Sequence, residues 1–296
     1  MPAFTLRGTF TALVTPFSEA DGSIDFPAYE KHLEAQIAGK IDGLVPCGTT
    51  GESPTLSEQE KFDLIQRTVR VAAGRSCVLA GIGANDTSKA VHQAQAAVEA
   101  GAQAVMLVMP WYNRPSQSGL TDYVEQVANT VKCPVVIYNI PARTGVSLEV
   151  DSLIEVAARC PNIVGLKDAS GTVNYCQTLL SRVGNRLSVL SGDDALTVPM
   201  MAVGAQGVIS VTSNVLPAAV GKVVHSALEG RFDVARSEHL RLLQVHEAMF
   251  CAPSPGPIKV ALAHRGVLAA RLRPPMDLPT PGQRARVLAA LQIFES

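Results

Sequence analysis

A lysine at the end of a short apolar run is the residue in this chain best suited to covalent chemistry. Of the eight lysines, only Lys167 terminates such a run, Ile163-Val164-Gly165-Leu166-Lys167. Burial disfavours the ammonium form of a lysine, which frees the amine to attack a carbonyl carbon and form a Schiff base. The alternative is a structural ion pair, because Asp168 is adjacent in the sequence. The strand-end position favours the Schiff-base role.

Hydroxyl groups near other expected strand ends could move protons for that chemistry. Tyr138 lies near the end of the run Pro134–Asn139, where its ring can pack while its hydroxyl faces the same end of the fold. A phenol can pass a proton if another hydroxyl accepts it, and Thr50 and Tyr112 follow two other runs. A tyrosine at a strand end packs more often than it reacts. Together with Lys167, however, these residues form an acid–base set suited to imine formation and carbon–carbon bond chemistry.

The turn Gly48-Thr49-Thr50-Gly51-Glu52 offers backbone N–H groups and hydroxyls that suit a carboxylate or a phosphate. Its glycine spacing matches neither a P-loop nor a dinucleotide fingerprint. Gly192-Asp193-Asp194 follow a later run, where barrels often bind phosphate, and two carboxylates there would repel one. An unphosphorylated substrate that carries a carboxylate therefore fits better.

Metal and thiol chemistry have little support. The six histidines fall in expected helices and form no H-x-x-x-H pattern. Asp193 and Asp194 alone offer too few oxygen ligands for a hard cation, so we expect no metal. No G-x-S-x-G elbow is present. The six cysteines form no C-x-x-C pair, and we expect them to be reduced and structural.

The elements that must position these residues alternate along the chain. Eight short apolar runs are expected strands: 9–15, 43–46, 77–81, 104–109, 134–139, 163–167, 187–191 and 207–211. Segments of helical length and spacing lie between them, at 26–40, 57–73, 87–100, 119–131 and 148–158. Apolar strands alternating with amphipathic helices predict a parallel α/β fold, and eight units predict a closed (β/α)8 barrel, also called a TIM barrel.

The pattern changes after about Gly230, where helices are expected at 232–250, 258–268 and 281–294. We therefore expect a barrel domain at 1–230 and a C-terminal helical domain at 231–296. The uncharged stretch 195–221 exceeds the roughly 20 residues that a spanning helix needs. Its prolines, glycines and polar residues instead predict a helix, a short strand and a turn.

Composition excludes several classes of partner. The chain has 296 residues, 47% of them hydrophobic, with 25 basic and 26 acidic side chains and a formal net charge of -1. This balance gives no basic surface for nucleic acid or an anionic membrane, so neither is an expected partner. The N-terminus lacks the basic and apolar regions of a secretory signal, and we expect a cytoplasmic location.

The motifs GTTGE, NRPSQ, YNIPART, GLKDASG, SGDDA and GVISV occur in the order and spacing of one family. From about Gly8 to residue 262 the chain resembles the dihydrodipicolinate synthase / N-acetylneuraminate lyase family, and within it the synthase branch. The resemblance implies a class I aldolase-type lyase that condenses pyruvate with L-aspartate 4-semialdehyde in lysine and diaminopimelate biosynthesis. It also implies no cofactor, since the lysine–pyruvate imine is itself the electron sink.

The same resemblance assigns roles to residues. Lys167 matches the Schiff-base lysine, Tyr138 the proton-relay tyrosine, and Thr50 the hydroxyl that links two tyrosines. Tyr112 matches a tyrosine contributed across a subunit interface, in a family whose usual assembly is a homotetramer. Thr49 and Thr50 match the loop that holds the pyruvate carboxylate.

Three further residues complete the expected substrate-binding set. Arg143 matches the arginine that binds the semialdehyde carboxylate, which a planar guanidinium can hold with two hydrogen bonds. Ile209 matches a position whose backbone carbonyl faces the active site, and Gly192 follows the seventh expected strand. Sialic acid lyases resemble the synthase branch but lack the P-x-R-T pattern around Arg143.

Two other functions remain open from the sequence. Members that act on keto sugar acids or N-acetylneuraminate share the lysine and the tyrosine, so the substrate is less certain than the reaction class. A barrel that binds a small carboxylate without catalysis is the more remote alternative. The set Lys167, Tyr138, Thr50 and Tyr112 argues against it.

A departure from the family concerns regulation. Lysine-inhibited members typically place a glutamate where this chain has Lys89, and histidines where it has Glu58 and Lys61. Asn85 and Ser53 remain, while Trp111 replaces the usual tyrosine. A cation at position 89 opposes the amino groups of lysine, so we expect weak or absent feedback inhibition.

Overall fold

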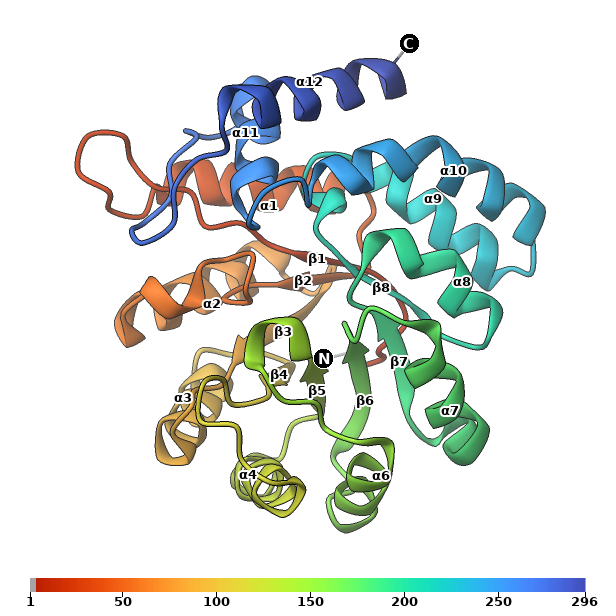
Figure 1. The fold of residues 1–296 in the computed structure, drawn as a ribbon. Coiled ribbons are helices and arrows are strands. Elements are labelled where there is room, and N and C mark those ends of the chain that lie inside the picture. The colour runs from red at the N-terminus through yellow and green to blue at the C-terminus, as the bar shows by residue number, and fades with distance from the viewer. Residues whose placement is uncertain (1–3, 296) are drawn as a thin grey trace.

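The computed structural model describes residues 4–295, and within them eight parallel strands close into a barrel (Figure 1). Every neighbouring pair of strands is parallel, and β1 pairs with β8 to complete the ring. The strands are β1 (Gly8–Ala12), β2 (Gly43–Val45), β3 (Cys77–Ile82), β4 (Ala104–Val108), β5 (Val135–Asn139), β6 (Ile163–Asp168), β7 (Ser188–Ser191) and β8 (Gly207–Ser210). All eight expected strands and the (β/α)8 barrel are confirmed.

The first strand is shorter than expected, for a reason that bears on the site. It ends at Ala12 rather than Thr15. Beyond it, the Thr15 hydroxyl leaves the sheet and donates a hydrogen bond of 2.7 Å to the carbonyl of Gly51. The end of the first expected strand therefore supports the loop that follows β2.

Helices surround the barrel as the apolar spacing predicted (Figure 1). Those of the barrel are α1 (Phe26–Ala38), α2 (Glu58–Ala72), α3 (Thr87–Glu99), α4 (Gln117–Thr130), α5 (Pro141–Thr144), α6 (Val150–Arg159), α7 (Val173–Val183), α8 (Thr197–Ala202) and α9 (Pro217–Leu228). Helix α2 begins with a capping box between Ser57 and Glu60, and α9 has Pro217 at its first position. Both are ordinary signals for the start of a helix.

Two apolar cores result from this arrangement. The inner one fills the barrel and contains Phe10, Met106, Tyr138, Leu190 and Ile209. The outer one lies between the strands and the helices. Because side chains alternate along each strand, one set points into the barrel and the other toward the helices.

Three helices follow the barrel, α10 (Phe232–Ala248), α11 (Gly256–His264) and α12 (Pro281–Glu295). In Figure 1 they lie on the side of α1, α8 and α9. Helix α10 packs on α9, and α12 packs on α10 and α11. Buried residues such as Leu242, Ile258 and Val287 belong to the same outer core as the barrel helices. The division into two domains at residue 230 stays a prediction. Residues 1–3 of the first expected domain and residue 296 of the second lie outside the described residues.

The uncharged stretch 195–221 contains α8, strand β8 and the 3₁₀ turn η4 (Thr212–Asn214), as predicted. Across residues 4–295, no helix is both long enough and apolar enough to cross a membrane.

Candidate active site

Lys167 and Tyr138 lie side by side on neighbouring strands. The register of β5 and β6 pairs the two residues, and both are almost fully buried. The Lys167 Nζ atom lies 4.0 Å from the centroid of the Tyr138 ring. An amine and a phenol thus meet at the carboxyl ends of two strands, where barrel enzymes place their reactive groups.

Asp168 does not act as the ion-pair partner of Lys167. Successive strand residues point to opposite faces, and among the described residues Asp168 Oδ2 is buried without a hydrogen-bond partner. Its Oδ1 accepts a hydrogen bond of 2.9 Å from the Ser170 N–H. Burial raises the pKa of the Asp168 carboxyl. The alternative interpretation of Lys167, a structural pair with Asp168, therefore has no support in the fold.

Gly192 leaves room for the end of the lysine side chain. A Cβ atom at this position would lie 3.2 Å from Lys167 Cε and 2.8 Å from the Ala169 Cβ. The loop is fixed there by a hydrogen bond of 2.7 Å from the Gly192 N–H to the Asp168 carbonyl. Gly192 therefore contacts Lys167 rather than the cavity described next.

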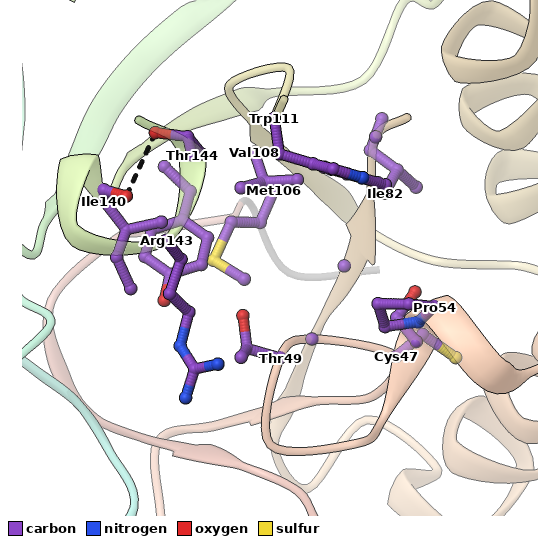
Figure 2. A pocket seen from close by; sticks show the side chains of 15 residues that line it. Cys47, Thr49, Pro54, Ile82, Met106, Val108, Trp111, Ile140, Arg143 and Thr144 are labelled. Atoms are coloured by element: carbon purple, nitrogen blue, oxygen red, sulfur yellow. Dashed lines mark hydrogen bonds between the residues drawn. The ribbon is translucent and has the colours of Figure 1, made fainter. Parts of the chain in front are cut away.

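A cavity of about 230 Å³ opens at this end of the barrel (Figure 2). Its lining comes from strands β3, β4 and β5 and from the loops after β2, β3, β4 and β5, and it includes Thr49, Trp111, Tyr138 and Arg143. Among the lining residues in the described part of the chain, Arg143 is the one that carries a charge. Lys167 does not line the cavity itself but contacts the Tyr138 ring, which does. An apolar cavity with one guanidinium suits a small carboxylate.

The loop after β2 is held by its own hydrogen bonds. The N–H groups of Gly51 and Glu52 donate to the carbonyls of Gly48 and Thr49, each at 3.1 Å. Thr49 is half-buried and faces the cavity, whereas Thr50 is buried beside it.

Tyr112 does not join the site within one chain. Its side chain is 88% exposed, its φ is 73°, and it does not line the cavity. Trp111, its neighbour, lines the cavity instead (Figure 2). The expectation that Tyr112 serves a neighbouring subunit stays a prediction.

Arg143 reaches the mouth of the cavity from the short helix α5. Its guanidinium and the Thr49 side chain both project into the space between their loops (Figure 2). One nitrogen, Nη2, donates a hydrogen bond of 3.3 Å to the Ser254 carbonyl of the C-terminal part. The remaining N–H groups can serve a ligand.

Asp193 and Asp194 hold loops rather than face the cavity. Asp194 Oδ2 accepts hydrogen bonds from the backbone N–H groups of Val211 (2.9 Å) and Thr212 (3.1 Å). Asp193 Oδ1 accepts one from Ala195 at 2.9 Å. Neither residue is among those that line the cavity, and the expectation that they repel a phosphate stays a prediction. Ile209 is buried in the inner core, which also contains Tyr138.

The six cysteines are all free. Cys47 lines the cavity, but burial raises the pKa of its thiol to about 12, which keeps the thiol protonated. Of the residues of the expected regulatory cleft, Glu58 and Lys61 lie on α2 and Lys89 lies on α3. There the Lys61 ammonium pairs with Glu58 at 2.8 Å, and Lys89 is exposed.

Sequence reasoning missed a buried ion pair behind the loop after β2. Lys259 Nζ lies 2.5 Å from Glu52 Oε1, and both side chains are almost inaccessible to solvent. The two residues are 207 positions apart. The available signal was a lysine inside the apolar segment Pro257–Leu262.

Comparison with known proteins agrees with this geometry. The profile of the dihydrodipicolinate synthetase family matches residues 5–293. A 4-hydroxy-tetrahydrodipicolinate synthase of Sorangium cellulosum (strain So ce56) is 49% identical over 296 residues, which is 100% of this chain and 98% of that protein.

Two solved structures extend the likeness to the whole fold. The crystal structure of dihydrodipicolinate synthase from Aquifex aeolicus is 40% identical with a TM-score of 0.95, and the match covers 98% of each chain. The 4-hydroxy-tetrahydrodipicolinate synthase of Methylacidiphilum fumariolicum SolV is 40% identical with a TM-score of 0.96, over 98% of this chain and 96% of that one. The chain belongs to the dihydrodipicolinate synthetase family.

Proposed function

We propose that the chain is a lyase that condenses pyruvate with L-aspartate 4-semialdehyde to 4-hydroxy-tetrahydrodipicolinate. The observation that carries the proposal is the buried amine of Lys167, which lies against Tyr138 rather than in an ion pair with Asp168. The identity of 49% to a synthase over the full chain supports the substrates.

The reaction begins when the Lys167 amine attacks C2 of pyruvate. A C–N bond forms, and the carbonyl oxygen leaves as water after two proton transfers, for which Tyr138 and Thr50 are the relay. Loss of a methyl proton then gives an enamine, with the positively charged nitrogen as the electron sink. No separate cofactor is needed in this scheme.

The enamine carbon next attacks the aldehyde carbon of the semialdehyde and forms the carbon–carbon bond. Arg143, at the mouth of the cavity, binds the carboxylate of that substrate. Thr49 and Thr50 hold the pyruvate carboxylate. Attack of the substrate's own amine on the imine carbon closes the ring and releases Lys167.

Arg143→Ala tests the substrate assignment. We expect the KM for the semialdehyde to rise at least about 10-fold, because removing one strong charged contact costs about 1.4 kcal/mol or more. Pyruvate should still form its imine on Lys167. Turnover of a keto sugar acid or N-acetylneuraminate by the unsubstituted protein, with none of the semialdehyde, would overturn the assignment in favour of a sister lyase.

We further propose a homotetramer in which Tyr112 completes the relay of a neighbouring subunit. The exposure and positive φ of Tyr112 support this, because the backbone holds the ring outward, where a second subunit can contact it. Light scattering gives the mass of the assembly. A fully active monomer with an unaffected Tyr112→Phe variant would contradict the proposal.

Feedback by lysine should be weak or absent. Lys89 is exposed where a lysine-binding cleft needs an anion, and Glu58 is engaged by Lys61. Half-maximal inhibition by submillimolar lysine in the condensation assay would count decisively against this.

A further inference from the structure

The pair Glu52–Lys259 connects the C-terminal helices to the loop that carries Thr49 and Thr50. Lys259 is fully buried on α11, and its Nζ donates to Glu52 Oε1 at 2.5 Å and to the Arg271 carbonyl at 2.8 Å. The ammonium also lies 4.2 Å from the centroid of the Phe17 ring. The charge is therefore surrounded by a carboxylate, a carbonyl and an aromatic face.

The carboxylate of Glu52 is occupied on both oxygens. Oε2 accepts a hydrogen bond of 3.0 Å from the Arg273 N–H, so both of its partners belong to the C-terminal part. Burial is expensive for such a pair, and it lowers the pKa of Lys259 to about 8 despite the attraction of Glu52. In proteins, apolar side chains of similar volume often stabilise a fold as well as a buried ion pair does. A role in holding the loop after β2 in position explains why the charged pair Glu52–Lys259 is buried here.

The backbone conformation of Glu52 also indicates that this residue holds the loop after β2 in position. The residue has φ 57° and ψ 36°, a left-handed conformation that is unfavourable for a residue with a side chain. Such a conformation persists only where the surroundings impose it. The side-chain hydrogen bonds to Lys259 and Arg273 supply that constraint, and the Glu52 N–H in turn donates to the Thr49 carbonyl at 3.1 Å.

We propose that Glu52 and Lys259 are positioning residues that hold the Gly48–Glu52 loop for binding of the α-keto acid carboxylate. The C-terminal helix α11 thus takes part in binding pyruvate without lining the cavity. This inference rests on the proposed function, because it takes the loop to be the carboxylate-binding one. Displacing Glu52 moves the Thr49 peptide through their shared hydrogen bond, and the hydroxyl of Thr49 then leaves the cavity wall.

Pyruvate-dependent labelling tests the proposal. Protein is incubated with pyruvate and borohydride over a range of pyruvate concentrations, and the reduced adduct on Lys167 is quantified by mass spectrometry. For Glu52→Gln and Lys259→Met we expect half-maximal labelling to need at least about 10 times more pyruvate. The double variant should need no more pyruvate for half-maximal labelling than the more strongly affected single variant, because both substitutions remove the same constraint on the loop.

Two control variants distinguish positioning of the loop from a general effect on the stability of the fold. Val287→Ala weakens the core beneath α12 without touching the pair, and Lys222→Met breaks an exposed ion pair to Glu238. Both should keep the pyruvate dependence of the unsubstituted protein. Two results would overturn the proposal. In the first, Val287→Ala raises the pyruvate concentration for half-maximal labelling as much as Lys259→Met does, at the same loss of Tm. In the second, this concentration changes less than twofold in both Glu52→Gln and Lys259→Met.

A second measurement needs no variant and covers the case in which Lys259→Met does not fold. Because coupling is reciprocal, pyruvate should slow hydrogen exchange in α11 although α11 does not contact the cavity. Exchange in α10, on the same C-terminal part, should change less. Equal effects in both helices would contradict the inference, whereas an unsubstituted protein that never labels would overturn the proposed function and the inference with it.

Discussion

At the scale of single residues, position along a strand decides which of two adjacent ionisable groups can react. Lys167 and Asp168 are neighbours in the sequence, yet one lies against Tyr138 of the inner core and the other is buried with no partner for its Oδ2 among residues 4–295. Lys167 and Tyr138 could be predicted from their strand-end positions, because such positions follow from local pattern alone.

Gly192 gives a prediction at this scale. Gly192→Ala should lower kcat at least about 10-fold and reduce stability by about 1 to 3 kcal/mol, because the new methyl group meets Ala169 and the end of Lys167. Steady-state kinetics and thermal unfolding measure both.

Gly221 provides the matched control for that substitution. It lies on α9 with open space where the new methyl group would point, so Gly221→Ala should leave kcat unchanged and stability equal or higher. An unchanged kcat in Gly192→Ala would show that the reactivity of Lys167 does not depend on the close approach of Gly192 to its side chain.

At the scale of elements, helices and strands followed from local patterns, whereas the links between distant loops did not. Apolar periodicity located the helices for which ranges were expected to within a few residues. The hydrogen bonds from Lys259 and Arg273 to Glu52 join segments more than 200 positions apart, and no periodicity encodes such a partner. Nor could the sequence show that Asp193 and Asp194 face loop backbone.

The start of α2 gives a prediction about pH. Glu60 closes the capping box and also pairs with Arg273, which lowers the pKa of its carboxyl to about 2 from an ordinary value of 4.5. The charged form is thus favoured in the fold. Its stabilisation is complete above about pH 4.5 and is lost as the pH falls toward 2.

Glu60→Gln should therefore lower Tm by about 1 to 3 °C at pH 7, a small effect because the pair is only partly buried and water screens it. The difference between the two proteins should close as the pH approaches 2. Thermal unfolding followed by circular dichroism measures it, and a difference that is constant with pH would rule out the ionised pair as its cause.

At the scale of the whole molecule, the C-terminal helices and the barrel share one outer core. Leu242 and Val287 belong to the same cluster as residues of the barrel helices α1 to α4 and α6 to α9. Arg143 and Glu52 at the barrel mouth also bond to the C-terminal part. The expected division at residue 230 describes the change in sequence pattern, and the shared core leads us to expect that the two parts unfold together.

Two probes can test whether the barrel and the C-terminal part unfold together. The single tryptophan, Trp111, reports on the barrel mouth by fluorescence, while hydrogen exchange of α10 reports on the C-terminal part. Across a urea series we expect the same midpoint from both. Loss of α10 protection at a clearly lower urea concentration would show two independent units.

The Schiff-base mechanism is tested most directly by the mass of the intact protein after incubation with pyruvate and borohydride, followed by peptide mapping. We predict one reduced pyruvyl adduct per chain, located on Lys167, and its loss in Lys167→Ala together with all but a few per cent of the condensation activity. A protein that forms no adduct, or a Lys167→Ala variant that keeps its activity, would contradict the mechanism.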